Sequence, residues 1–262
     1  MNAMQIALVK KDLWSVTSNK RLFPVLLLVP IILTLVLPTI FVLSIHFAPE
    51  ELGDFQNMLR LLPGVGEPID LQRLVLDLVL NRVMPMFFLM IPIMAASVMA
   101  ASAFVGEKEK RTLETLLYCP LTLKQIFEAK ILASFAMSMA VSFASFASMM
   151  LVIEVEIVLT TGSMLIPNIG WLITMLLVSP SISLIAITFI VRGSAKAQTM
   201  EEAQQRAVFL ILPILILVVG QFTGIILISP WLLLGVGAVV ALLAWLLIKG
   251  SMSRFNYEML LK

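Results

Sequence analysis

The sequence predicts an all-α membrane protein with six transmembrane helices, an amphipathic helix at the N-terminus, and a short cytoplasmic helix between spans two and three. Apolar residues make up 60% of the chain and charged residues 13%, a composition too apolar for a soluble domain. Five runs without charge are each long enough to cross a bilayer, which takes about 20 residues, and the last is long enough to cross twice. The predicted spans are residues 23–47, 84–105, 131–153, 164–191, 207–228 and 231–248.

Positive charge is distributed unevenly along the chain, and this distribution predicts the orientation. Six spans place both termini on the same side of the membrane. That side carries 15 of the 18 Lys and Arg residues, whereas the opposite side carries Arg60, Arg73 and Arg82. Cytoplasmic loops are enriched in Lys and Arg, so we expect both termini and the segment 106–130 to be cytoplasmic. The sequence thus predicts one multi-pass domain, residues 1–262, in the cell (inner) membrane.

The N-terminal segment, residues 1–22, has the pattern of an amphipathic helix. Ile6, Val9, Leu13 and Val16 recur at helical spacing, with charged residues between them. Such a pattern is typical of a helix that lies on the membrane surface and buries one apolar face. We therefore expect these four side chains to form the buried face.

Two later segments carry further structural signals. Residues 48–83 form the longest stretch expected outside the cell, and their second half has a helical pattern that we expect to run straight into the second span. The third span carries Ser134, Ser138 and Ser142 at four-residue spacing. Small residues at this spacing let helices approach closely, so they predict packing against a neighbouring helix rather than a polar path.

Several classes of function are disfavoured by what the sequence lacks. No charged residue falls within a predicted span, which argues against an ion-coupled transporter working alone. The sequence has no Gly-Lys dipeptide and hence no P-loop, so any ATP hydrolysis belongs to another subunit. Glu201, Glu202 and Arg206 match the EExxxR pattern of intramembrane CAAX-type proteases, but the chain has one histidine, His46, which cannot build a His-rich metal site. The sequence predicts no catalytic residue and no metal site.

The charged segment 106–130 is the most informative part of the chain. Residues 112–119 should form a short helix that stops at Pro120, with Leu113, Leu116 and Leu117 on one face. Such a short helix is marginal by itself and cannot bury an apolar face alone. The alternative is a solvated, salt-bridged loop. The apolar face favours a partner surface on the cytoplasmic side.

The run EKEKRTLETLLYCP, from Glu107 to Pro120, resembles the intracellular loop of ABC-2-type permeases, the membrane subunits of ABC exporters. The usual family pattern is E-x-E-x-G-T-L-E-x-L-L-x-x-P, and this chain has Arg111 in place of the glycine. The stretch 199–216 resembles the second cytoplasmic loop and fifth span of the sodium-efflux-like branch. The N-terminal amphipathic helix resembles the family's elbow helix.

This resemblance implies a dimer of permeases, homomeric or heteromeric, in which each permease docks on an ATP-binding subunit that holds ATP and Mg. The helix 112–119 would be the coupling helix, and the chain itself would bind no cofactor. The implied contacts with the ATPase subunit are Glu107, Glu109, Arg111, Thr112, Leu113, Glu114, Leu116, Leu117 and Pro120. The implied substrate path, at the dimer interface, is lined by Met86, Phe87, Met90, Met94, Gln221 and Phe222.

The expected function is therefore that of a permease subunit in an ATP-driven exporter, with no catalytic activity of its own. Its apolar spans favour an amphipathic or hydrophobic substrate that moves outward. Three alternatives stay open: a membrane scaffold or sensor subunit of an ATPase complex, a sodium-ion efflux permease, and a stand-alone channel. The excess positive charge follows from the topology, so the expected partners are protein subunits and the lipid bilayer, with no nucleic acid.

Overall fold

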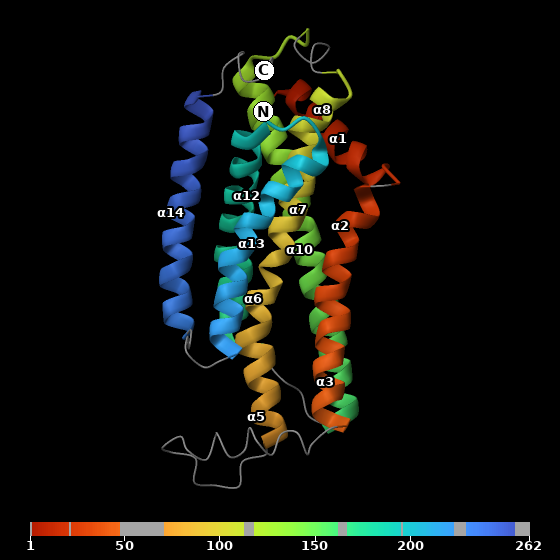
Figure 1. The fold of residues 1–262 in the computed structure, drawn as a ribbon, viewed down its shortest axis with the longest axis vertical. Helices are drawn as coiled ribbons and strands as arrows, with labels where there is room; N and C mark the ends of the chain where they lie inside the picture. Colours follow the sequence, from red (N-terminus) through yellow and green to blue (C-terminus); the bar gives the residue numbers. More distant parts are fainter. Residues whose placement is uncertain are drawn as a thin grey trace.

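The computed structural model describes residues 2–20, 22–47, 71–112, 118–161, 167–194, 196–222 and 229–254, and no strand occurs among them. Six of its helices are long and apolar enough to cross a membrane, as predicted. They are Leu22–Ser44, Val75–Glu109, Leu123–Leu159, Ile169–Ser194, Met200–Gln221 and Pro230–Ser251. These helices run side by side as one elongated bundle (Figure 1).

Several of the spans are chains of α-helical segments joined by π-helical turns, here marked η. The N-terminal helix α1 is Ala3–Thr17, and the first span consists of α2 (Leu22–Ile31), η1 (Ile32–Val36) and α3 (Leu37–Phe47). The second span consists of α5 (Leu71–Leu78), η2 (Val79–Val83), α6 (Met84–Phe88), α7 (Met90–Ala100), η3 (Ala101–Val105) and α8 (Gly106–Glu109). The third is α10 (Leu123–Thr161), and the fourth consists of α11 (Ile169–Ile173), η4 (Thr174–Val178) and α12 (Ser179–Ser194). The fifth is α13 (Met200–Phe222) and the sixth α14 (Pro230–Arg254).

Polar side chains fix where several of these helices begin. Thr122 and Gln125 form a reciprocal capping box ahead of α10: Thr122 Oγ1 accepts the Gln125 N–H at 3.3 Å, and Gln125 Oε1 accepts the Thr122 N–H at 2.9 Å. Thr199 accepts the N–H of Glu202 at the start of α13. Such caps satisfy backbone donors that have no partner inside the helix.

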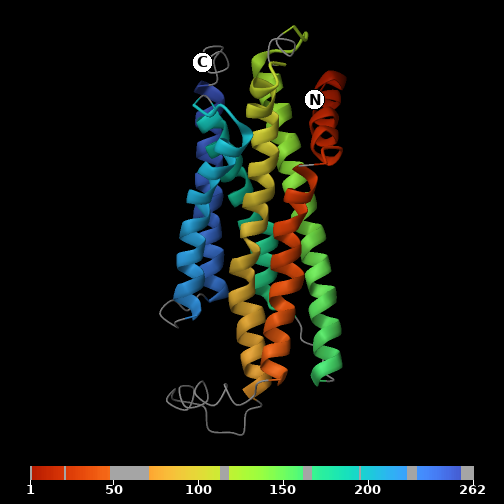
Figure 2. The ribbon, with the colours of Figure 1, turned by 45° about the vertical axis from the view of Figure 1, so that its right-hand side comes forward.

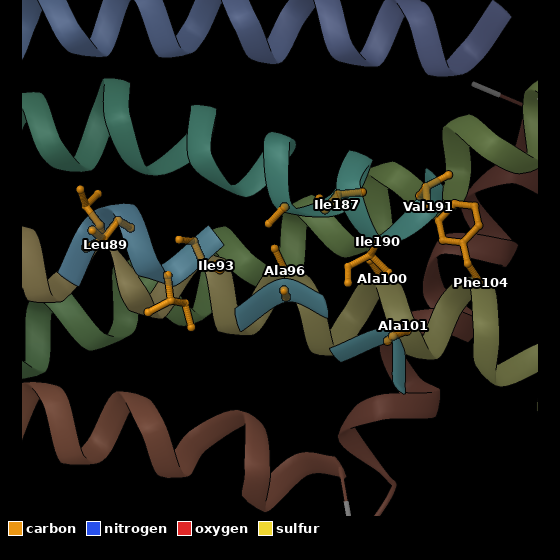
Figure 3. Packing of buried hydrophobic residues seen from close by; sticks show 14 of the residues in the cluster. Leu89, Ile93, Ala96, Ala100, Ala101, Phe104, Ile187, Ile190 and Val191 are labelled. Carbon is orange, nitrogen blue, oxygen red and sulfur yellow. The ribbon is translucent and has the colours of Figure 1, made fainter. Parts of the chain in front are cut away.

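The second span is the central helix of the bundle. In its most apolar stretch 89% of the residues are buried, compared with 17% in the sixth span, which lies at the edge. Figure 3 shows side chains of α7, such as Ile93 and Ala96, packed with Ile187 and Ile190 of α12. The helix also begins at Leu71 and continues without a break into the span, as the sequence predicts for the segment before it.

The serine stripe of α10 faces this central helix. Ser134, Ser138 and Ser142 are fully buried, and α10 packs along α7. Ser138 Oγ donates to the Pro92 carbonyl of α7 and lies 2.9 Å from Ser183 Oγ of α12. The prediction that these small residues serve packing is confirmed.

The buried face of α1 differs from the predicted one. α1 buries Gln5, Leu8, Asp12 and Val16, whereas Ile6 is 55% exposed. Val16 is buried and Val9 and Leu13 are half-buried against apolar clusters, so apolar periodicity misplaced Ile6 and missed Gln5, Leu8 and Asp12. The physical reason is that α1 packs on α10 and the end of the second span, where charged side chains supply partners for its polar residues.

Buried or partly buried charges flank the predicted third span. Lys130 of α10 is 3% exposed, and Thr39 of the first span donates a hydrogen bond to Glu156 near the other end of α10. α10 has 39 residues, so it is about 58 Å long, roughly twice the hydrocarbon thickness of a bilayer. The helix therefore extends past the predicted span 131–153 at both ends, and both of these charges lie outside that span.

Candidate functional site

One end of the bundle gathers α1, α8, the first turn of α10 and the first turn of α13. Figures 1 and 2 both show these segments at the end where α14 also finishes. We call it the loop end, because the charged segment that follows α8 leaves the bundle there. Within it, α8 contacts α1 on one side and α13 on the other.

Ion pairs join α8 to α1 and α10. Lys11 Nζ of α1 donates a hydrogen bond to Glu107 Oε1. Lys130 Nζ of α10 lies 2.8 Å from Glu107 Oε2 and donates to the Ala103 carbonyl. The Glu107 carboxylate is shared between lysines of two different helices. Glu107 is 7% exposed and Lys130 is buried with it, whereas the side chain of Lys11 is 51% exposed.

Asp12 is the least satisfied member of this cluster. Its Oδ1 lies 3.3 Å from Lys11 Nζ and its Oδ2 lies 3.8 Å from Lys130 Nζ. No described residue donates a hydrogen bond to Oδ2. Burial raises the pKa of the Asp12 carboxyl above its ordinary value of 3.8, although Lys130 and Lys11 both favour the charged form. We name Lys11, Asp12, Glu107 and Lys130 the charge cluster.

A cavity of about 230 Å³ lies beside the charge cluster. It lies between α1 and the end of the second span. Its lining residues are Lys11, Asp12, Ser15, Ser102, Ala103, Gly106, Glu107, Lys110 and Thr112.

The other side of α8 is joined to α13. Glu109 Oε2 accepts the backbone N–H of Met200 at 3.0 Å. A Cβ on Gly106 would lie 3.0 Å from Met200 Sδ, so the glycine leaves room for the Met200 side chain where α8 approaches α13. These contacts connect α8, at the end of the chain's second span, to the start of the fifth span, α13.

α8 ends in a complete Schellman motif. The Thr112 N–H donates to the Glu107 carbonyl, and the Arg111 N–H donates to the Lys108 carbonyl. Arg111 occupies the left-handed position of this motif, with φ 55°. Residues 110–112, which complete this motif, are exposed at the loop end.

The comparison with known proteins agrees with this architecture. The family model described as ABC-2 type transporter matches residues 5–234, most of the chain. The chain belongs to the ABC-2 type transporter family. It is therefore a membrane component of an ABC transporter, and its six spans make it a multi-pass membrane protein. No curated protein and no solved structure matches it significantly.

The residues that the resemblance assigned to ATPase contact fall into three groups in this ABC-2 permease. Leu113, Glu114, Leu116 and Leu117 lie outside the described residues. Arg111, Thr112 and Pro120 are exposed at the loop end. Glu109 is exposed and accepts a hydrogen bond from the Met200 N–H of α13. Glu107 points inward to Lys11 and Lys130. Glu107 therefore has its ion-pair partners within the permease itself.

The residues assigned to the substrate path lie mostly on one stripe of the central helix. Between Val83 and Glu107, Phe87, Met90 and Met94 are the residues that keep partial exposure, whereas Met86 is buried. On α13, Gln221 Oε1 is buried without a hydrogen bond from any described residue, and the side chain of Phe222 is outside the described residues. The permease thus leaves one narrow apolar stripe of its central helix open.

The protease-like EExxxR residues have structural roles in the permease. Glu202 and Arg206 form an ion pair of 2.6 Å one helical turn apart. Glu202 Oε2 also accepts the Gln198 N–H, and Arg206 donates to the Gly193 carbonyl. Together these bonds fix the turn between α12 and α13.

The sequence reasoning missed Lys11, Asp12 and Lys130 as members of the site. One signal was available: a lysine between Phe127 and Ile131, at the start of an apolar helix, needs a buried counter-charge. The identity of that counter-charge was not available, because Glu107 and Asp12 lie far from Lys130 in the chain.

Proposed function

We propose that this chain is the permease subunit of an ATP-driven exporter, docked through its 112–119 segment on an ATP-binding subunit that hydrolyses ATP with Mg. The observation that carries the proposal is the continuity of the central span. It runs from Val75 to Glu109 and leads through one tight turn directly into that segment. A displacement of the segment by the ATPase would therefore act on the helix with the most neighbours in the bundle.

The proposed complex holds two permeases, identical or paralogous, and two ATP-binding subunits. The positive-inside distribution supports a cytoplasmic location of the loop end, with both termini on that side. The open stripe of Phe87, Met90 and Met94 would face the second permease and line the path for an amphipathic or hydrophobic substrate moving outward. Flexible methionines suit ligands whose shape is loosely specified.

The test is affinity purification of the tagged permease from its native membrane, followed by intact-complex mass and ATPase assays. The wild type is compared with the Leu116→Asp, Leu117→Asp double variant. A buried apolar contact that is replaced by charge costs more than about 2 kcal/mol at an interface hot spot, so we expect at least about a tenfold loss of bound ATPase. Leu159→Asp is the matched control, because Leu159 is exposed at the opposite end of α10.

The outcome that contradicts the proposal is a wild-type permease that purifies without any ATPase subunit. Proteoliposomes then separate the remaining functions. ATP-dependent movement of a hydrophobic fluorescent dye supports the exporter, and movement of radioactive sodium instead supports an efflux permease for that ion. Hydrolysis with neither movement indicates a scaffold or sensor subunit, and conductance without ATP indicates a channel.

A further inference from the structure

Glu107 lies five residues before the 112–119 segment, which we call the coupling segment. It is the second residue of α8, and the chain leaves the bundle five residues later. Whatever binds Glu107 therefore moves with the coupling segment or resists its movement. The structure gives the two carboxylate oxygens of Glu107 to two different helices: Oε1 to Lys11 of α1 and Oε2 to Lys130 of α10.

A hydrogen-bonded ion pair connects α8 to α1. α1 packs its apolar side chain Leu8 against Ile126 and Ala129 of α10. Toward α8, the cavity beside the charge cluster lies between the two helices. The hydrogen bond from Lys11 to Glu107 bridges this gap. Glu107 is buried and the side chain of Lys11 is half exposed, and this hydrogen bond joins α1 directly to α8.

α1 is in turn connected tightly to the first span. Asn19, just after α1, accepts the N–H of Phe23 through its carbonyl and the N–H of Leu22 through its side chain. A shift of α1 therefore reaches the start of α2 within a few residues. The chain of contacts runs from the coupling segment through Glu107 and Lys11 to the first span.

We infer that Lys11 and Glu107 are positioning residues that pass the movement of the coupling segment to α1 and the first span, in parallel with its direct effect on the second span. This inference rests on the proposed function, because it needs an ATPase that moves the segment. Lys130 holds Glu107 in place from the α10 side. Glu109 and Gly106 make the corresponding connection to α13.

The test uses the intact permease–ATPase complex in lipid nanodiscs. Hydrogen–deuterium exchange of peptides covering 3–17 is measured with the ATPase free and with it trapped by ADP and vanadate. In the wild type we expect trapping to change α1 exchange severalfold. Lys11→Met should abolish this change while ATP hydrolysis continues, and Lys11→Arg, which keeps a donor, should restore it.

The matched control is Lys10→Met, the neighbouring lysine, which is exposed and outside the charge cluster. We expect it to respond as the wild type does. A second variant pair guards against simple misfolding. Glu107→Gln leaves the Lys130 charge buried without its closest partner, whereas Glu107→Gln with Lys130→Met removes both charges and should recover the melting temperature without recovering the α1 response.

Two results would overturn the inference. One is a trapped wild-type complex in which α1 exchange stays unchanged while exchange at the loop end changes. The other is a Lys11→Met or Glu107→Gln/Lys130→Met complex with the full wild-type response. In both cases the ATPase is still bound, so the proposed function survives. A wild-type permease that binds no ATPase contradicts the proposed function instead.

Discussion

Arg111 illustrates at the scale of one residue how a family pattern acquires a physical reason. Its φ of 55° lies in the left-handed region, where the Cβ of an L-residue crowds the following carbonyl oxygen. The family pattern has glycine at this position, and the Schellman hydrogen bonds around it explain why. The chain keeps the motif with arginine, so the geometry is held by its neighbours and not by the residue's own preference.

Arg111→Gly should therefore stabilise the isolated permease. Relief of the left-handed strain is worth about 1–2 kcal/mol, and the extra flexibility of glycine in the unfolded chain offsets about 0.5–1 kcal/mol of it. Lys110→Gly is the control, because Lys110 has an ordinary right-handed conformation with φ −82°. This variant relieves no strain and should lose stability through the added flexibility of the unfolded chain. Denaturant melting in one detergent measures both variants, and an equal loss of stability in both would contradict this account.

The helices themselves show what packing adds to local preference. Among the described residues the second span contains two π-helical turns, η2 and η3, and such turns leave backbone groups in need of other partners. At η2 the Leu80 carbonyl accepts the indole N–H of Trp171 at 3.1 Å, and Asn81 Oδ1 accepts the Asn168 N–H at 2.9 Å. The wide turn is thus completed by the start of α11, a partner almost a hundred residues away in the chain.

Two glycines of α14 give a test of helix packing. A Cβ on Gly237 would lie 2.8 Å from Leu177 Cδ2 and 3.1 Å from Val178 Cγ2, whereas a Cβ on Gly235 would meet nothing within 4 Å. Gly235→Ala should stabilise the helix by about 1 kcal/mol. Gly237→Ala should be less stable than Gly235→Ala by about 1–3 kcal/mol, because overpacking opposes the same gain. Unfolding in SDS compares the stabilities of the two variants. Similar gains in stability would contradict this account, because the side chains of η4 would then move aside at little cost.

The whole molecule is a bundle in which one helix is enclosed and the others surround it. Burial falls from the second span to the sixth, and the described side chains of α13 and α14 expose many large apolar residues. Lipid covers most such surface in a membrane protein. The stripe of Phe87, Met90 and Met94 is different, because it is the part of the enclosed helix that the chain leaves partly open.

If this stripe faces a second permease, a cysteine placed there should cross-link two copies. We expect Met90→Cys, with Cys119→Ser to remove the native thiol, to give a covalent dimer with a short bis-maleimide in native membranes. Ile91→Cys is the adjacent control, and Ile91 is fully buried inside the chain. Gel mobility distinguishes the two. Cross-linking of neither variant, or of both equally, would move the dimer interface away from this stripe.

The number of spans and the packing role of the α10 serines followed from the sequence, because hydropathy and residue size act over one or two helical turns. The burial of Asp12 on α1 and the role of Glu107 did not. Both depend on charges that meet across the bundle: Lys130 supplies the partner that lets Asp12 and Glu107 turn inward, at separations of 23 residues or more along the chain. Apolar periodicity compares the faces of each helix one helix at a time, whereas the tertiary structure decides which polar groups meet, and that choice connects α8 to α1.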